Sequence, residues 1–192
     1  MNIVQKGEMP VPKILDNPRE VILNHAREIV LNEGYDNLTI RAVSKKSGIS
    51  VGTIYNCFST KTELTLQLLE DYWYGYLDTV DEIDKNESDL FLKLFKIYEK
   101  FNSFFDTFKE DWLKNTTSGH SENSLIRKNN FLEKIIKRVE AILIESQNNN
   151  SINLFLEPYT ISKFLISNFS MMAQFKDFEY NDFEKIIRKI LQ

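Results

Sequence analysis

The sequence is poor in the residues that allow covalent or metal-based stabilisation. Among its 192 residues there are one cysteine, Cys57, and two histidines, His25 and His120. A lone cysteine cannot form a disulfide within the chain, and these histidines have no zinc-ligand spacing. The fold must therefore rest on the packing of apolar side chains, and neither a metal nor another cofactor is expected.

Long apolar runs and strand patterns are also missing. Residues 1–16 contain no apolar core of a secretion signal, and no later run has the length that a membrane helix needs. No segment alternates apolar and polar residues as a half-buried strand does. These absences predict an all-α protein with no membrane partner, and the cytoplasm is its expected compartment.

Acidic residues are missing from one window of the chain. The whole chain has a formal charge of −4, but residues 37–62 contain no Asp or Glu. The four cations of this window, Arg41, Lys45, Lys46 and Lys61, give it a local charge of +4. A basic window is often only a solvated surface, and contact with the phosphates of a nucleic acid is the alternative.

The same window has the pattern of a helix-turn-helix. Thr39 is expected to cap a short helix that ends at Ser47, and Ser50 is expected to cap the next helix. Gly48 lies between the two and breaks the first. Two short helices joined by a turn that contains glycine are the sequence form of a helix-turn-helix.

Apolar residues at three- and four-residue steps extend this pattern to about nine helices. The fourth helix opens with a capping box, Thr60 and Glu63, and is expected to run to about Asp81. Residues 114–124 have the composition of a loop, and Asn181 is expected to cap the last helix.

Residues 21–69 resemble the N-terminal domain of the TetR family of transcription regulators. The residues that carry the resemblance, all in one register, are Glu33, Gly34, Tyr35, Thr39, Ile40, Ser47, Gly48, Ile49, Ser50, Gly52, Thr53, Ile54, Tyr55, Phe58, Lys61, Glu63 and Leu64. The resemblance implies a flexible tail (1–16), a helix-turn-helix DNA-binding domain (17–64) and a ligand-binding and dimerisation domain (65–192). The remainder of the chain agrees with the family in helix count.

The resemblance also implies which residues contact DNA. Base contacts are expected from the recognition helix, where Asn56 can read adenine and a methyl of Val51 or Thr53 can touch thymine. The expected DNA-binding residues are Thr39, Arg41, Ser50, Val51, Gly52, Thr53, Tyr55, Asn56 and Lys61. Cys57 departs from the family, which usually has His or Tyr there, so one phosphate contact is lost. It is interpreted as a small residue beside Phe58, with a redox role as the alternative.

The second domain is expected to bind an effector and a second copy of the chain. A mainly apolar ligand is expected among Trp73, Tyr76, Phe101, Phe105, Phe108 and Trp112, although aromatic residues at helical spacing more often form a core. The expected dimer interface contains Phe164, Leu165, Phe169, Met172, Ile186, Ile187 and Ile190. Family resemblance favours a homodimeric repressor that leaves a near-palindromic operator when a small ligand binds.

Two other classes of function compete with this interpretation. The chain is not expected to be an enzyme, since it has no glycine-rich phosphate loop after a strand and no Ser/His/Asp arrangement. A helical interaction or ligand-sensing protein that has lost specific DNA binding is the other alternative. Cys57 and the modest net charge are compatible with this loss of DNA binding, whereas the presence of Arg41 and Lys61 disfavours it.

Overall fold

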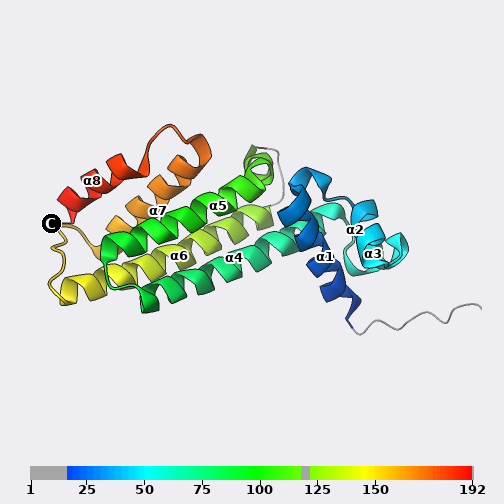
Figure 1. The fold of residues 1–192 in the computed structure, drawn as a ribbon, viewed down its shortest axis with the longest axis horizontal. Coiled ribbons are helices and arrows are strands. Elements are labelled where there is room, and N and C mark those ends of the chain that lie inside the picture. The colour runs from blue at the N-terminus through cyan, green and yellow to red at the C-terminus, as the bar shows by residue number, and fades with distance from the viewer. Residues whose placement is uncertain (1–16, 118–121, 192) are drawn as a thin grey trace, which may run out of the picture. The chain divides into compact units, whose positions relative to one another are not determined.

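All regular structure in the described part of the chain is helical. The structure, a computed structural model, describes residues 17–117 and 122–191, with side chains for 17–108 and 130–191. This part contains eight α-helices, one 3-10 helix and no strand (Figure 1), which confirms the all-α prediction of about nine helices. They are α1 (Pro18–Glu33), η1 (Tyr35–Asn37), α2 (Ile40–Ser47), α3 (Val51–Cys57), α4 (Lys61–Asn86), α5 (Leu90–Thr117), α6 (Glu122–Asn148), α7 (Pro158–Phe175) and α8 (Tyr180–Ile190).

The chain divides into two compact units. The first ends at Leu64 and the second begins at Thr65, so the boundary falls within the residues of α4. The assignment of DNA binding to the first unit and of ligand binding and dimerisation to the second stays a prediction.

Side-chain caps set the helix boundaries of the first unit. Asn17 Oδ1 accepts the N–H of Glu20 at 3.4 Å, and Thr39 Oγ1 accepts the N–H of Ala42 at 3.0 Å. Pro18 occupies the first position of α1, where the missing N–H leaves no helix bond unmade. Because these bonds join residues three apart, the starts of α1 and α2 follow from local sequence.

The apolar faces of α1, α2 and α3 form one core. On α3, Ile54 is fully buried, and Phe58, four residues later, is fully buried at its C-terminal cap. The other buried apolar residues are Ile22, Ala26, Ile29, Val30, Leu38, Ile40, Val43, Ile49 and Leu64. Since α3 turns only this edge inward, most of its surface is left to solvent.

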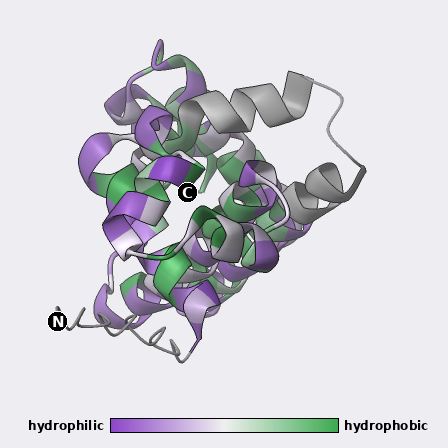
Figure 2. Ribbon diagram, turned by 90° about the vertical axis from the view of Figure 1, so that its right-hand side faces the viewer, coloured by the Kyte–Doolittle hydropathy of each residue, from purple (hydrophilic) through white to green (hydrophobic). Residues whose placement is uncertain are grey.

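Aromatic side chains form much of the core of the second unit. Helices α5 and α6 both pack against α7. Within the core, Tyr76 meets Phe101 edge-to-face at 5.7 Å between ring centroids, and its hydroxyl donates to the carbonyl of Ile97 at 2.9 Å. Burial raises the pKa of Tyr76 well above its ordinary value. Figure 2 shows hydrophobic and hydrophilic residues alternating along the helices, as amphipathic packing requires.

Helix α4 is longer than the sequence predicts. It was expected to end near Asp81 but continues to Asn86, because the polar residues after Asp81 include good helix formers. The break falls at residues 87–89, where Asp89 Oδ1 accepts the N–H of Leu92 at 2.7 Å and caps α5.

The loop expected over residues 114–124 is wrong at both ends. Helix α5 continues to Thr117 and α6 begins at Glu122, while residues 118–121 lie outside the described part. Polar composition alone does not separate a loop from a solvated helix end. A departure from helical backbone occurs earlier, at Phe108, where φ is −121°.

The cap expected from Asn181 is also wrong. Helix α8 begins one residue earlier, at Tyr180, and Glu179 at its N-cap makes no side-chain cap bond. Tyr180 is buried and stacks on Tyr98 at 4.8 Å between ring centroids. Tertiary packing of the tyrosine therefore outweighs the local capping preference of Asn181.

The described part of the chain contains neither a membrane-spanning helix nor a cluster of metal ligands. Within the described residues, no helix has both the length and the apolarity that crossing a bilayer requires. Nor do three or more His, Cys, Asp or Glu side chains gather in that part of the chain to hold a metal ion.

Candidate DNA-binding surface

Local hydrogen bonds fix the turn between α2 and α3. Gly48 has a φ of 71°, in the left-handed region that favours glycine, and its N–H donates to the carbonyl of Ser44 at 3.0 Å. The Ser44 hydroxyl donates to the carbonyl of Ile49 at 2.7 Å. Ser50 Oγ accepts the N–H of Thr53 at 3.1 Å and so caps α3. These bonds hold the second helix of the pair in a defined direction.

The residues predicted to contact DNA lie on the solvent side of this unit. On α3, Val51 is 39% and Tyr55 is 49% exposed, large values for apolar or aromatic side chains. Thr53 is half-buried, with its hydroxyl 2.9 Å from Ser50 Oγ. The remaining predicted residues, all exposed, are Thr39, Arg41, Ser50, Gly52, Asn56 and Lys61. An exposed face of this kind is what a recognition helix requires.

Gly52 has no structural reason within the protein to be glycine. A Cβ added there would meet only Ser50 Oγ, at 3.9 Å, which is an ordinary van der Waals contact. Glycine in a helix costs about 0.5–1 kcal/mol relative to alanine. A glycine that neither packing nor backbone geometry demands, on an exposed helix face, fits the close approach of another molecule.

The two neighbouring lysines of α2 differ in their surroundings. Lys46 lies 3.5 Å from carboxylate oxygens of both Glu28 and Glu33 on α1. Lys45 and Arg41 are exposed and, among the described side chains, take part in no ion pair. The sequence left open which of the two lysines faces away from DNA; in the structure Lys46 is the one that faces carboxylates of α1.

Lys61 sits at the N-terminus of a long helix. Thr60 Oγ1 accepts the N–H of Glu63 at 3.0 Å, and Glu63 in turn accepts the N–H of Ser59 at 2.8 Å. The Lys61 ammonium lies 5.1 Å from the ring centroid of Tyr35. A cation beside the first N–H groups of a helix makes a favourable position for a phosphate.

Sequence reasoning missed Arg19. Its Nη1 donates to the carbonyl of Cys57 at 3.0 Å, and its guanidinium lies 4.4 Å from the ring centroid of Phe58. The bond joins residues 38 positions apart and ties the start of α1 to the end of α3. No local spacing signals such a contact. The sequence shows only that a basic residue follows Pro18.

The surroundings of Cys57 and His25 agree with structural roles for both residues. The Cys57 side chain is half-buried beside the buried Phe58, which agrees with the interpretation as a small packing residue. His25 lies 3.4 Å from Glu28 on the same helix, in keeping with a structural role. His120 lies outside the described residues.

The aromatic residues predicted to line a ligand pocket are mostly core. Tyr76, Phe101, Phe105 and Phe108 are at most 7% exposed and pack against other aromatic rings. These four belong to the aromatic core, because residues at helical spacing face the interior together, and their part in ligand binding stays a prediction. Trp73 is also buried but lines a pocket described below. The side chain of Trp112 lies outside the described ones.

The residues predicted for the dimer interface divide into two groups. Leu165, Phe169, Met172 and Ile187 are at most 3% exposed and pack inside their own chain, so they present no surface to a partner. Helices α5 and α6 cover that side of α7, and α5 also packs against α8, so the structure gives these four no part in an interface. Phe164 and Ile186 are 43% and 47% exposed, and Ile190 is half-buried.

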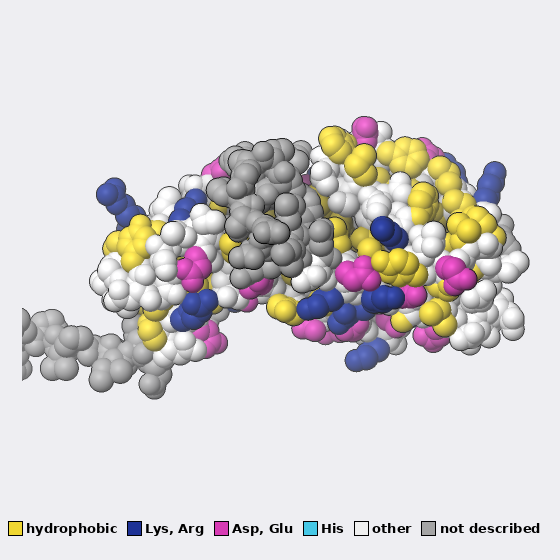
Figure 3. Space-filling view, turned by 180° about the vertical axis from the view of Figure 1, so that it is seen from behind, with side chains coloured by type: hydrophobic (Ala, Val, Ile, Leu, Met, Phe, Trp, Pro, Cys, Tyr) yellow, Lys and Arg dark blue, Asp and Glu magenta, His cyan; other side chains and the backbone are white. Residues whose placement is uncertain are grey.

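Other apolar residues are exposed near them along the chain. Met171 and Phe175 on α7 are 57% and 60% exposed, and Phe178 before α8 is 40% exposed. Figure 3 shows hydrophobic side chains gathered on the face of the second unit that this view presents. Phe164, Met171, Phe175, Phe178 and Ile186 are called the α7–α8 patch below.

A fixed turn, a short exposed helix and flanking cations define a helix-turn-helix DNA-binding protein. Residues 22–68 match the family model described as bacterial regulatory proteins, tetR family. This match lies almost wholly in the first unit, and it confirms the resemblance seen in the sequence for these residues. The proteins that this model describes are transcription regulators, not enzymes, in keeping with the expectation from the sequence.

Solved structures extend the likeness beyond the first unit. NemR of E. coli in its reduced form has a TM-score of 0.67 and 16% identity, with 91% of this chain and 97% of that chain covered. A regulator from Cytophaga hutchinsonii has a TM-score of 0.67 and 19% identity, covering 91% and 95%. FadR of Bacillus subtilis, solved with stearoyl-CoA, has a TM-score of 0.60 and 16% identity, with 89% of this chain and 96% of that chain covered. At these identities the likeness is one of fold. No curated protein matches the chain.

Proposed function

We propose that the protein is a repressor that binds a near-palindromic operator as a homodimer and leaves it when a small molecule binds the second unit. The observation that carries the proposal is the exposed face of α3, which includes a glycine that the fold does not require, flanked by the exposed cations Arg41 and Lys61. A regulator that binds chromosomal DNA would work in the cytoplasm.

Base reading is assigned to the exposed side chains of α3. Asn56 offers the paired donor and acceptor that match adenine, and Val51 offers methyl groups that match thymine. Gly52 lets the backbone approach the base edges. Because Thr53 is half-buried and hydrogen-bonded to Ser50, its contribution is its methyl group rather than its hydroxyl.

Phosphate binding is assigned to residues at the helix starts. Thr39 lies at the N-cap of α2 with Arg41 two residues later, and Lys61 opens α4. These side chains, with Tyr55, would hold the protein in register on the duplex without reading sequence. Lys46 is left out of this set because Glu28 and Glu33 already neutralise it.

Dimerisation is assigned to the α7–α8 patch. Exposed apolar side chains that gather on one surface mark interaction sites, and one recognition helix reads too few bases for a specific site. Two copies related by a two-fold axis would place two such helices about 34 Å apart, one turn of DNA. A dimer of this kind requires a near-palindromic operator.

Ligand control is assigned to the second unit. FadR of Bacillus subtilis was solved with stearoyl-CoA, and this chain shares its fold. We infer that an effector here binds the second unit and acts through α4, the helix within which the boundary falls. Release requires that the ligand bind more tightly to a dimer with unsuitable spacing of its recognition helices.

The first test is operator selection from genomic fragments. Purified protein is incubated with fragmented DNA of its source, bound fragments are sequenced, and the best site is titrated at several salt concentrations. We expect one near-palindromic site whose affinity falls steeply with salt. Lys61→Ala should reduce the slope of log K against log salt by about 1, because one phosphate contact is lost.

A matched lysine serves as the control. Lys46→Ala also removes one positive charge, but this ammonium faces two carboxylates of its own chain. The salt slope should therefore remain that of the unmodified protein. If no fragment is enriched even after native mass spectrometry shows the protein free of ligand, the alternative takes over: an interaction protein that has lost specific DNA binding.

The dimer has its own test. Size exclusion with light scattering should give the mass of two chains, and Met171→Glu with Ile186→Glu should give the mass of one and weaken operator binding. Ile144→Glu is the control, since Ile144 is 41% exposed but lies on α6, outside the patch. A dimer that survives the paired substitution would remove this patch from the interface.

A further inference from the structure

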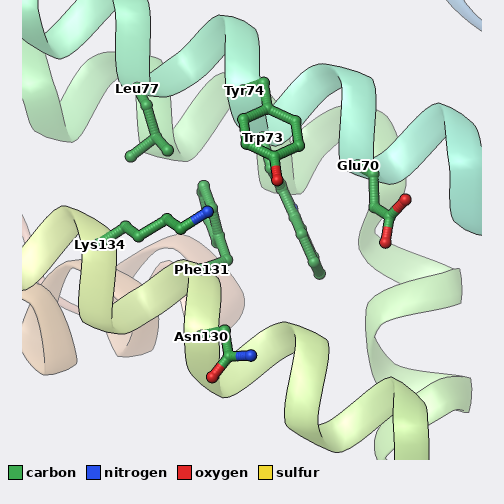
Figure 4. A pocket seen from close by; sticks show the side chains of 7 residues that line it. All are labelled: Glu70, Trp73, Tyr74, Leu77, Asn130, Phe131 and Lys134. Carbon is green, nitrogen blue, oxygen red and sulfur yellow. The ribbon is translucent and has the colours of Figure 1, made fainter.

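A small pocket opens between α4 and α6 in the second unit. Its volume is about 130 Å³, and its lining residues come from 70–77 and 130–134 (Figure 4). Pockets for drug-sized ligands measure about 300–1,000 Å³, whereas a cavity of about 150 Å³ can hold benzene. The size therefore suits one ring better than a long acyl chain.

The inner wall of the pocket is flat and aromatic. The rings of Trp73 and Phe131 stack with centroids 4.6 Å apart and planes 11° from parallel, and Leu77 completes the apolar lining. All three are at most 8% exposed. Tyr76 supports Phe131 from the core, edge-to-face at 6.1 Å. A rigid wall of ring faces and edges favours a planar aromatic ligand over a flexible aliphatic one.

The rim of the pocket carries an ammonium group. Lys134 is exposed, and its Nζ lies 4.9 Å from the ring centroid of Tyr74. Figure 4 shows its side chain reaching from α6 toward α4, with the amide of Asn130 also on the α6 side. Among the described side chains Lys134 pairs with no carboxylate, so this charge is available to a ligand. An ammonium and an amide N–H₂ both donate, and a carboxylate accepts from both.

The other charged residue of the rim limits the ligand to one negative charge. Glu70 lines the same pocket and already takes part in an interaction within the protein. Its carboxylate would repel a second carboxylate on the ring, because like charges that approach one another are unfavourable. A monoanion with its charge turned toward Lys134 avoids this repulsion.

We propose that the α4–α6 pocket is the effector site and that it takes a single-ring aromatic carboxylate. The ring lies against the Trp73–Phe131 wall and the carboxylate meets Lys134 and Asn130. This assignment rests on the proposed function, since the regulatory role of a ligand follows from it. It narrows the mainly apolar ligand expected from the sequence to one planar ring with one charge.

The test uses sodium benzoate as the probe. The chain has two tryptophans, so Trp112→Phe leaves Trp73 as the only indole, and its fluorescence is followed during titration. Calorimetry on the unmodified protein gives a second measurement that does not depend on this variant. We expect saturable quenching by benzoate, at least tenfold weaker binding of cyclohexanecarboxylate and of benzyl alcohol, and still weaker binding of phthalate.

Variants separate the charge from the fold. Lys134→Met should weaken benzoate binding about tenfold or more, the loss expected for a charge-assisted hydrogen bond, while Lys134→Arg should restore most of it. Lys100→Met is the control, since Lys100 is exposed on α5 and does not line the pocket. Equal binding of cyclohexanecarboxylate, or an unchanged Lys134→Met, would overturn the ligand class.

Failure of this inference can be told apart from failure of the proposed function. If an operator is selected but benzoate neither binds nor releases it, the ligand assignment is wrong and the regulator stands. If benzoate binds through Lys134 but no operator is selected, the site stands and the DNA-binding function is wrong.

Discussion

The two units hold their helices in different ways. In the first unit, α2 and α3 have only 8 and 7 residues, and each is started by a side-chain cap. In the second unit, α5 and α6 have 28 and 27 residues, and α7 and α8 begin without a side-chain cap bond. A short helix gains little from its own length and depends on its ends, whereas a long helix is held by the face it buries.

This difference separates the two kinds of functional surface. The exposed face of α3, proposed to bind DNA, is positioned by a glycine, two serines and one arginine, whose bonds involve the backbone. The pocket of the second unit is shaped by stacked rings that also belong to the core. The first unit should therefore be sensitive to single local bonds, and the second to the volume of its core.

The largest effect is expected in the aromatic core of the second unit. Phe169 is fully buried and contacts the rings of Tyr98 and Phe183. Phe169→Ala should lower the free energy of unfolding by about 3–5 kcal/mol, because the substitution leaves a cavity that the neighbouring side chains fill only in part. Urea unfolding followed by circular dichroism measures this. Phe155→Ala, at a ring 68% exposed, should change it by less than about 0.5 kcal/mol. Similar losses in both variants would contradict packing as the source.

Two glycine substitutions should have opposite signs in the two units. Gly48→Ala should cost about 1–2 kcal/mol, since its φ of 71° is unfavourable for a residue with a Cβ although the space is open. Gly75→Ala, at an exposed position inside α4 with equally open space, should gain about 0.5–1 kcal/mol. Thermal unfolding of both variants tests this. The same sign in both would mean that local backbone geometry does not set the turn.

A smaller effect is expected where α1 holds the end of α3. Arg19→Met removes the bond to the Cys57 carbonyl and the contact with Phe58, and should cost about 1 kcal/mol. Operator affinity should also fall several-fold, because the recognition helix loses a support. Arg27→Met is the matched control: its bond to Asn24 stays within α1. An equal loss of affinity in both variants would indicate a general charge effect instead.

The smallest effect is expected at an ion pair of the second unit. Lys96 lies 2.9 Å from Glu87, and this bond, with the backbone N–H of Asp89, lowers the pKa of Glu87. A carboxyl whose pKa is lower in the folded state stabilises the fold above its ordinary pKa and loses that contribution as the pH falls through the lowered value. Glu87→Gln should therefore shift the urea midpoint slightly at neutral pH, and the shift should fade as the pH drops below the ordinary pKa of a glutamate and through the lowered one. Glu99→Gln, at an exposed residue of α5, is the matched control variant, unfolded under the same conditions.

How far the sequence predicts the molecule depends on the separation of the interacting residues. Thr39, Gly48 and Ser50 act on neighbours within five residues, so the helix-turn-helix and its exposed face could be predicted. The bond from Arg19 spans 38 residues and leaves no local pattern.

The packing of the second unit is harder to predict from the sequence, because its contacts join residues that are far apart in the chain. The wide apolar face of α7 indicates burial but not which part of it another helix of the same chain covers. Leu165 and Phe164 are adjacent in sequence, yet one is buried and the other exposed. The pocket joins α4 to α6, and only tertiary structure brings Lys134 to the ring of Tyr74.

The position of Cys57 has a practical consequence. It is the chain's only cysteine, it is half-buried, and it ends the recognition helix. A nitroxide attached to this thiol would put one spin label on each copy of α3 in the proposed dimer, with no engineered cysteine and no competing reaction site. The dipolar coupling between the two labels would then measure the separation of the recognition helices directly, with operator, with benzoate and with neither.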